Sequence, residues 1–394
     1  MKKTMFLFCM IALFSAIIII PASATTWPIY NGQNIDDYTK IGGAHFSEVS
    51  EWDTIFVYNG TYAAFTVDKP SLTIKGESKD VVRIETGDSI QIPSSSGNGI
   101  RTIIDGFSVL NSVHGLSLGN VGSATGSIIK NCIFDGISYD DGIKIEADDA
   151  VFENNTIRNA TGIYTGIYVW CINGTLKSND ISGSTGAGLD FYDRAQETTV
   201  AYNNIHDNGY AGFEFYNTVE IQYIFLNNIV NNGVPATASG TPVPATLLWN
   251  TTAPQSYVYN GNTYSGFLGN YWGTDYAGSD TNGDGIGDTP FELPEGLGYD
   301  YAPLMEPFEN YAMGGQQSAP TAAFTSESRT GTAPLTVTFT DQSTGSPTTW
   351  AWDVNNDGSV DYTTQNATHT YTAAGNYTVN LGVTNAGGSD SEVK

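Results

Sequence analysis

One short stretch of the chain carries oxygen-bearing side chains at the spacing of a calcium-binding loop. Residues 280–288 read DTNGDGIGD, which places oxygen donors at loop positions 1, 3, 5 and 9 and a glycine for the sharp turn at position 6. Position 12 is Phe291 rather than Glu, and no helical pattern flanks the loop, so it is not an EF-hand. The alternative is a turn that needs no metal. The expected calcium ligands are Asp280, Asn282, Asp284, Ile286 (through its carbonyl) and Asp288.

The same spacing recurs near the C-terminus, in residues 353–361, which read DVNNDGSVD. This second, weaker candidate competes with a domain-specific turn that accounts for the same residues without a metal. Its ligands would be Asp353, Asn355, Asp357 and Asp361.

A different set of chemical groups recurs at steps of 22 or 24 residues. Four segments begin with glycine and read GIKI from residue 142, GIYV from 166, GLDF from 188 and GFEF from 212. In a strand, the third residue of such a segment lies on the face opposite the second and fourth. The outward-facing third positions are Lys144, Tyr168, Asp190 and Glu214, preceded by Ser117 of the segment GLSL from residue 115. Two residues further on come Glu146, Trp170, Tyr192 and Tyr216, with Asp193 and Arg194 at the edge.

This outward column has the chemistry of a groove that binds sugars. Aromatic rings pack on the apolar faces of sugar rings, and carboxylates accept hydrogen bonds from sugar hydroxyls. The alternative is a solvated sheet face whose aromatic residues reflect strand propensity alone. The expected partner is an extracellular polysaccharide or cell-surface glycan, bound by Lys144, Tyr168, Trp170, Asp190, Tyr192, Asp193, Arg194, Glu214 and Tyr216.

Catalysis is the rival hypothesis for the same face. Carboxylates on neighbouring coils lie about 4.8 Å apart by strand spacing, close to the roughly 5 Å of a retaining glycosidase. Asp190 and Glu214 are therefore the candidate catalytic pair of a glycoside hydrolase. A polysaccharide lyase would need a base, and no motif selects one among the available groups. These are Lys144, Arg158 and Arg194, near Asp140, Asp141, Asp148 and Asp149.

The elements that position these residues repeat with a period near 24. Asparagine falls at 131, 155, 179, 203 and 227, isoleucine at 133, 157, 181, 205 and 229, and another apolar residue at 128, 152, 176, 200 and 224. Short strands at a fixed period predict an all-β fold, a right-handed parallel β-helix in which each coil buries its apolar column against the next. The asparagines are expected to stack in one line. Residues 25–52 would cap the first coil, 234–244 form a long loop, and 267–305 close the far end.

The two ends of the chain have other compositions. Residues 1–24 are predicted to be a secretory signal peptide, because Lys2 and Lys3 are followed by an apolar run and an Ala-x-Ala site. The alternative is a retained membrane anchor. No later stretch is long and apolar enough to span a membrane, so a secreted or cell-surface protein is expected. The β-helix would occupy 25–312, residues 313–318 a linker, and residues 319–394 a small β-sandwich with strands at 334–339, 369–371 and 377–383.

Composition excludes several classes of partner. Acidic residues number 41 and basic residues 15, a net charge of −26, which disfavours nucleic acid and anionic lipid. Only Cys132 and Cys171 remain after the signal segment, too few for a disulfide framework. Oligomeric state has no signature here. Glycosylation sequons, which matter only if the host modifies them, stand at Asn59, Asn154, Asn159, Asn173, Asn250, Asn366 and Asn376.

Two family resemblances follow from these motifs. The chain resembles the NosD-type secreted β-helix proteins, a copper-binding family, in the segment DTIFVYNGTY at 53–62, the coil pattern, GNYWG at 269–273 and YAPLM at 301–305. The combination with the second domain is familiar from archaeal surface proteins. Copper needs clustered His, Cys or Met. The histidines here are scattered, so copper binding is not expected.

The C-terminal domain resembles a PKD module. The matching segments are APLTVTF at 333–339, Trp352-Asp353, GNYTV at 375–379 and VTNAGG at 383–388. The resemblance implies a spacer or adhesion unit. It also implies a final strand after Ala-Gly-Gly, and because only residues 389–394 follow, the sequence is expected to be a truncated or fragmentary one.

Overall fold

A computed structural model describes residues 24–86, 90–92, 101–119, 124–138, 142–161, 165–216, 222–240, 247–313, 320–327, 330–345, 347–355, 359–385 and 388–394. These residues divide into two compact units, each described by itself. The first unit holds the chain up to residue 223 together with 229–247 and 293–298. The second holds 224–228, 248–292 and 299–394. The expected signal segment and most of the expected linker lie outside the described residues, so the proposed boundaries stay predictions.

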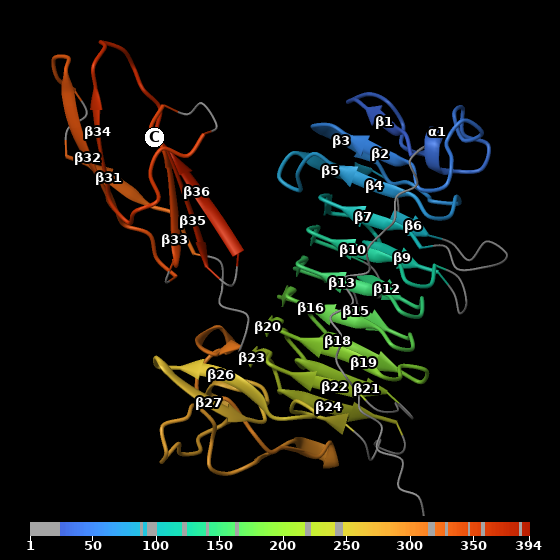
Figure 1. Ribbon diagram of the computed structural model, residues 1–394. Coiled ribbons are helices and arrows are strands. Elements are labelled where there is room, and N and C mark those ends of the chain that lie inside the picture. Colours follow the sequence, from blue (N-terminus) through green and yellow to red (C-terminus); the bar gives the residue numbers. More distant parts are fainter. Residues whose placement is uncertain are drawn as a thin grey trace, which may run out of the picture. The chain divides into compact units, whose positions relative to one another are not determined.

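The first unit is a parallel β-helix, as predicted, built from three sheets whose neighbouring strands come from successive coils (Figure 1). Its first sheet runs β1 (Thr26–Ile29), β2 (Thr54–Val57), β4 (Thr73–Gly76), β7 (Ile103–Asp105), β10 (Ile128–Lys130), β13 (Val151–Glu153), β16 (Thr175–Lys177), β19 (Thr198–Ala201) and β22 (Gln222–Phe225).

The other two sheets follow the same rule, and from β4 to β24 each coil contributes one strand to every sheet. The second sheet runs β3 (Gly60–Ala63), β5 (Val82–Thr86), β8 (Ser108–Leu110), β11 (Ile133–Asp135), β14 (Thr156–Arg158), β17 (Asp180–Ser182), β20 (Asn204–His206) and β23 (Asn228–Val230). The third sheet runs β6 (Ile90–Ile92), β9 (Leu116–Leu118), β12 (Ile143–Ile145), β15 (Thr165–Val169), β18 (Ala187–Tyr192), β21 (Phe213–Tyr216) and β24 (Ala236–Ser239).

Buried apolar columns hold successive coils together. In the first sheet Phe152, Leu176 and Val200 stand in register and are almost completely buried. In the second sheet Ile157, Ile181 and Ile205 do the same. Burying a side chain of this size contributes about 1.5–3 kcal/mol, and every coil repeats the contribution.

An asparagine ladder runs inside the first unit. The side-chain amide of Asn155 donates to Oδ1 of Asn179 (3.1 Å), and that of Asn179 donates to Oδ1 of Asn203 (2.9 Å). The backbone N–H groups of Cys132, Asn155 and Asn179 donate to the same carbonyl oxygens of the next coil. The predicted stack is therefore correct for these three asparagines, all of them buried.

The prediction for Asn131 is wrong. Strand β10 pairs Ile128 with Val151, a step of 23, so Cys132 and not Asn131 lies opposite Asn155. Asn131 instead accepts a hydrogen bond from the Asn154 amide (2.6 Å). The predicted columns through Ile128 and Ile133 shift by one residue for the same reason.

Asparagines at left-handed turn positions form further links on the exterior. Asn154, Asn159 and Asn173 have φ between 54° and 58°, a conformation that asparagine tolerates better than most residues. The Asn159 amide donates to Asp135 (2.8 Å), and the Asn173 amide donates to Asp149 (2.6 Å). The turns of neighbouring coils are thus linked through exposed side chains.

Two predicted irregular segments contain strands. Residues 25–52 were expected only to cap the helix, but β1 pairs in parallel with β2 and the short helix α1 (Asp36–Thr39) follows. The segment 234–244 was expected to be a loop, but β24 lies within it and pairs with β21. Among the described residues, no helix has the length and apolar character needed to cross a membrane.

The second unit includes most of the segment 267–305, which was expected to close the helix, and strands on either side of it. In this unit β26 (Gln255–Tyr259) pairs antiparallel with β27 (Asn262–Gly266) and β30 (Ala312–Met313), and β28 (Phe291–Glu292) pairs with β29 (Tyr299–Asp300). The remaining short elements are β25 (Leu247–Leu248), η1 (Gly273–Asp275) and η3 (Phe308–Asn310), with η2 (Pro294–Gly296) in the first unit.

The C-terminal domain is the predicted β-sandwich. One sheet holds β31 (Phe324–Ser326), β32 (Leu335–Asp341) and β34 (Ala367–Tyr371), and the other holds β33 (Thr349–Asp353), β35 (Asn380–Asn385) and β36 (Gly388–Val393). Trp352 is fully buried between them. The implied strand after Ala-Gly-Gly is β36, which pairs with β35 along its whole length.

Candidate functional site

The outer face of the third sheet carries the predicted column in register. Lys144 lies beside Tyr168, Tyr168 beside Asp190, and Asp190 beside Glu214 on successive strands. The inward neighbours of each residue are buried and apolar, which fixes the outward direction of these side chains. The repeat thus gathers residues 46 positions apart in sequence, from Tyr168 to Glu214, on one surface.

The tyrosines beside this column are in contact. The ring centroids of Tyr168 and Tyr192 are 5.6 Å apart with an angle of 39° between planes, and those of Tyr192 and Tyr216 are 4.4 Å apart and nearly parallel. Stacking covers the facing surfaces of Tyr192 and Tyr216, so this pair presents ring edges rather than broad faces to a ligand. Desolvation, Tyr216 and the nearby acids raise the pKa of Tyr192, which keeps its hydroxyl protonated.

Cations cover the other aromatic surfaces. The Arg194 guanidinium lies 5.7 Å from the Trp170 ring, and the Lys144 ammonium lies 5.9 Å from the Tyr168 ring. Arg194 also binds both carboxylate oxygens of Asp148, each at 2.7 Å. Burial would raise the pKa of Asp148, but this contact holds it below its usual value. Arg194 is therefore neutralised locally and held in place.

Three residues at the end of this face were not predicted. Ser239 donates its hydroxyl to Glu214 (2.7 Å), and Thr237 donates its hydroxyl to Glu295 (2.9 Å). Thr237 and Ser239 were missed because β24 lies in a segment rich in Pro, Ala and Thr. A strand one period after β21 was the available signal. Glu295 comes from η2, and its φ of 56° is unusual for a non-glycine residue; no local pattern pointed to it.

Other candidates are not brought to this face. Arg158 lies on β14 of the second sheet, where it pairs with Asp135 (2.8 Å). Asp149 accepts the Asn173 amide, and Asp193 is exposed beside the tyrosines. Asp140 and Asp141 lie outside the described residues.

The loop at 280–288 is held mainly by its own main chain. Asp280 accepts the N–H groups of Gly283 and Gly285, each at 2.8 Å, and Asp284 accepts that of Ile286 (2.8 Å). Asp288 accepts the Ser279 hydroxyl and the Thr281 N–H, which lowers its pKa. Side-chain type suits calcium, but within the described residues no three acidic, His or Cys side chains gather in the geometry of a metal site. Calcium at this loop stays a prediction.

The second loop shows the same internal bonding. Asp361 accepts the N–H of Val354 (2.9 Å), and Asp353 accepts that of Asn355 (3.4 Å). Asp357 lies outside the described residues, so the expected ligand set cannot be assembled from them.

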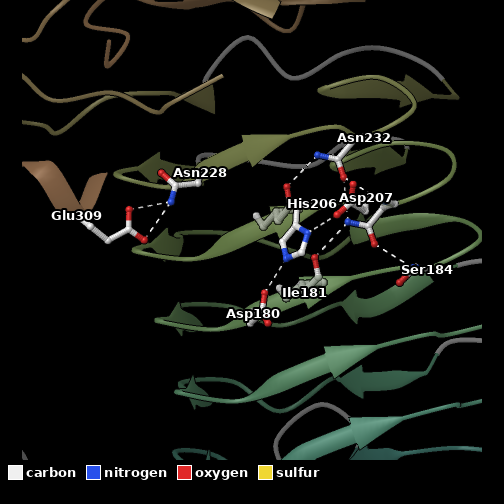
Figure 2. Close-up of polar contacts among 10 residues, drawn as sticks. Asp180, Ile181, Ser184, His206, Asp207, Asn228, Asn232 and Glu309 are labelled. Atoms are coloured by element: carbon white, nitrogen blue, oxygen red, sulfur yellow. Dashed lines mark hydrogen bonds and ion pairs between the residues drawn. The ribbon is translucent and has the colours of Figure 1, made fainter. Parts of the chain in front are cut away.

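A charged cluster that the sequence did not reveal lies on the second sheet. Figure 2 shows His206 between two carboxylates, with Nε2 2.9 Å from Asp180 and Nδ1 2.7 Å from Asp207. The hydrogen bond to Asp180, together with that to Asp207, raises the pKa of His206 to about 9 despite partial burial. At neutral pH the imidazolium donates to both acids and links β17 to the turn after β20.

The second unit has its own buried carboxylate, Asp300. It accepts the N–H of Asn270 (2.8 Å) and the indole N–H of Trp272 (2.9 Å) on one oxygen. A side chain at Gly269 would collide with this carboxylate, because an added Cβ would lie 1.9 Å from its oxygen. Complete burial raises the pKa of Asp300 to about 7 even though these donors oppose the shift. The Gly-Asn-x-Trp motif thus supplies the hydrogen-bond donors and the space that accommodate the Asp300 carboxylate.

Comparisons with known proteins agree with this architecture. A family model described as periplasmic copper-binding protein (NosD) matches residues 46–278, and a PKD domain model matches residues 317–394. No curated protein matches the chain.

Solved structures offer only distant likenesses. The pectate lyase Pel9A is 14% identical with a TM-score of 0.31 over 53% of this chain, which spans about half (54%) of that enzyme. The ORF18 protein of Geobacillus virus E2 is 12% identical with a TM-score of 0.32, covering 81% of this chain and 68% of its own. A solution NMR structure from Methanosarcina mazei is 42% identical with a TM-score of 0.17, covering 34% of this chain and 86% of that one.

Likenesses at these TM-scores carry no information about ligand or reaction. The family model, in contrast, covers more than half of the chain and coincides with the coils that build the three sheets. The protein is therefore a member of the NosD family, with a PKD domain at its C-terminal end.

Proposed function

We propose that the third sheet binds a glycan through a surface called here the tyrosine face, formed by Tyr168, Tyr192, Glu214 and Tyr216, with the largely buried Asp190 between Tyr168 and Glu214 in register. The observation that carries the proposal is the contact between the three tyrosines beside two carboxylates in register. A row of identical chemistry repeated from coil to coil suits a polymer of repeating units.

The geometry changes the mode of binding that the sequence suggested. Because Tyr192 and Tyr216 stack on each other, a sugar would contact the ring edges and hydroxyls instead of lying flat on every ring. The protonated Tyr192 hydroxyl can donate to a sugar oxygen, and Glu214 can accept from a sugar hydroxyl while Ser239 holds it in place. Direction-specific hydrogen bonds of this kind favour selectivity over strength.

The proposed setting is outside the cytoplasm. The matching family is described as periplasmic, and residues 1–24 have the composition of a secretory signal. We propose that the protein is secreted or held at the cell surface, with the PKD domain as a spacer or adhesion unit.

Binding is tested by titrating the full-length protein with a panel of acidic, neutral and amino-sugar oligosaccharides in a calorimeter. Tyr192→Ala should weaken the tightest ligand at least about tenfold, equivalent to about 1.4 kcal/mol. Tyr210→Ala is the matched control, because Tyr210 is an exposed tyrosine outside the face. Equal losses in both variants, or no binding by any sugar, would remove the proposal.

Catalysis is distinguished by following product release from the same panel. The proposal expects no turnover. If products appear and both Asp190→Asn and Glu214→Gln abolish them, the face is the active site of a polysaccharide-degrading enzyme and the binding role is secondary.

A further inference from the structure

The family description names copper, and the possible copper donors of this chain can be followed one by one. Copper in proteins is held by imidazole, thiolate and thioether groups. The chain has four histidines, and after residues 1–24 its cysteines are Cys132 and Cys171. All six residues fall within the described parts of the chain, as do the thioethers of Met305 and Met313.

The histidines are dispersed along the chain. His45 lies before β2, where it packs on the Tyr38 ring at 4.8 Å and contacts Glu48. His114 lies in the connection between β8 and β9, and His206 lies several coils further on, on β20 of the second sheet. His369 is in the C-terminal sandwich, where its Nδ1 contacts the Tyr362 hydroxyl (3.0 Å). Within the described residues, His, Cys, Asp and Glu form no group of three that could hold a metal.

His206 has the surroundings nearest to those of a ligand, because two carboxylates flank it (Figure 2). Both ring nitrogens are already committed, one to each acid. Those acids stabilise the charged imidazolium, and a protonated nitrogen has no lone pair to give to a metal. Copper would have to displace a proton that both neighbours hold in place.

The thiols are equally unsuited. Cys132 and Cys171 are completely buried in different coils, Cys132 between β10 and β11 and Cys171 after β15. Burial raises the pKa of each thiol to about 12. The thiolate is the form that binds metals, so neither sulfur is available in the folded protein.

We infer that this member keeps the β-helix of the NosD family and lacks a copper site. The solenoid then serves as a scaffold whose outer faces have been given other side chains, and copper chemistry is not what selects them. The inference is independent of the glycan proposal and holds whether or not a sugar binds.

The experiment is equilibrium dialysis of the full-length protein against Cu(II), and against Cu(I) under reducing conditions, with metal analysis of both chambers. The expected result is no saturable binding tighter than about 1 μM, or about −8.2 kcal/mol. Saturable binding of copper below that concentration would overturn the inference, and its loss in one of the variants His45→Gln, His114→Gln, His206→Gln or His369→Gln would identify a ligand.

The scaffold also supplies a positive control. Arg158, Ser182 and His206 stand in register on β14, β17 and β20 and face outward, with strands about 4.8 Å apart. The double variant Arg158→His with Ser182→His would place two new imidazoles on neighbouring strands, independently of His206. Copper binding by this variant, with none by the natural protein, supports the inference because it shows that the fold can present a copper site and that the assay detects it.

Discussion

Replacing Asn179 by alanine should destabilise the β-helix far more than removal of an exposed asparagine. Asn179 is almost completely buried in the asparagine ladder. Its Oδ1 accepts the backbone N–H of Asn155 (3.0 Å) and the Asn155 amide (3.1 Å), and its own amide donates to the carbonyl of Phe152 (2.8 Å). Alanine supplies none of these partners.

The expected magnitude comes from the groups left behind. Two N–H donors on Asn155 lose their acceptor and the Phe152 carbonyl loses one of its hydrogen bonds, in a site that excludes water. Leaving one buried polar group unsatisfied costs about 1–3 kcal/mol, and neighbouring losses add only partly. We therefore expect Asn179→Ala to lower the free energy of unfolding by about 3–6 kcal/mol, a large share of the 5–15 kcal/mol of a typical domain.

The measurement is urea unfolding followed by circular dichroism, with the midpoint shift converted through the slope m. Asn154→Gly is the matched control, because Asn154 is exposed one position from the ladder and glycine keeps its left-handed backbone at φ 54°. The control should lose less than about 1 kcal/mol. A loss of that size for Asn179→Ala as well would refute the view that the ladder is a main source of stability.

Three further outcomes follow from the charged groups. The pKa of His206 is raised to about 9, so the stability that its ion pairs contribute is complete below pH 6.5 and is lost as pH rises through 9. After discounting for partial exposure, the free energy of unfolding should decline by about 1–2 kcal/mol over this range, and His206→Gln should remove the decline. The pKa of Asp300 is raised to about 7, so the unfolding free energy should fall between about pH 4 and pH 7, and Asp300→Asn should flatten that dependence in the same scans. Calcium at about 100 times its Kd should stabilise the loop at 280–288 by about 2.7 kcal/mol, visible as a rise in the melting temperature that Asp284→Ala removes; an equal rise with magnesium at the same ionic strength would reduce the loop to a simple turn.

Periodicity made the fold predictable, and small departures from it limited the details. The repeat placed Tyr168, Asp190 and Glu214 on one face with steps of 22 and 24, because strand alternation and coil length act together. One coil with a step of 23 moved Asn131 out of the ladder, since a shift of one residue changes the position of every side chain in a turn. The sequence alone does not reveal this shift, because asparagine occupies both position 154 and position 155.

The rest of the site depends on contacts between distant residues. Glu295 reaches Thr237 across 58 positions in sequence, from a short turn whose strained backbone no propensity would favour. The cluster around His206 joins two coils through side chains that look like ordinary surface residues in isolation. Local sequence specifies strands and turns, whereas these pairings are set by tertiary packing.

The exposed asparagines that link neighbouring coils also belong to three of the sequons. Asn154, Asn159 and Asn173 each begin a sequon, and the amide nitrogen of each already donates to the neighbouring coil. That nitrogen is the atom to which a sugar is attached. A glycosyl group replaces one of the two amide hydrogens, so on the folded protein the sugar would have to be accommodated beside the intercoil bond. We therefore expect attachment at these three positions before the coil closes, during synthesis or export. At these turns, modification is therefore expected to precede folding.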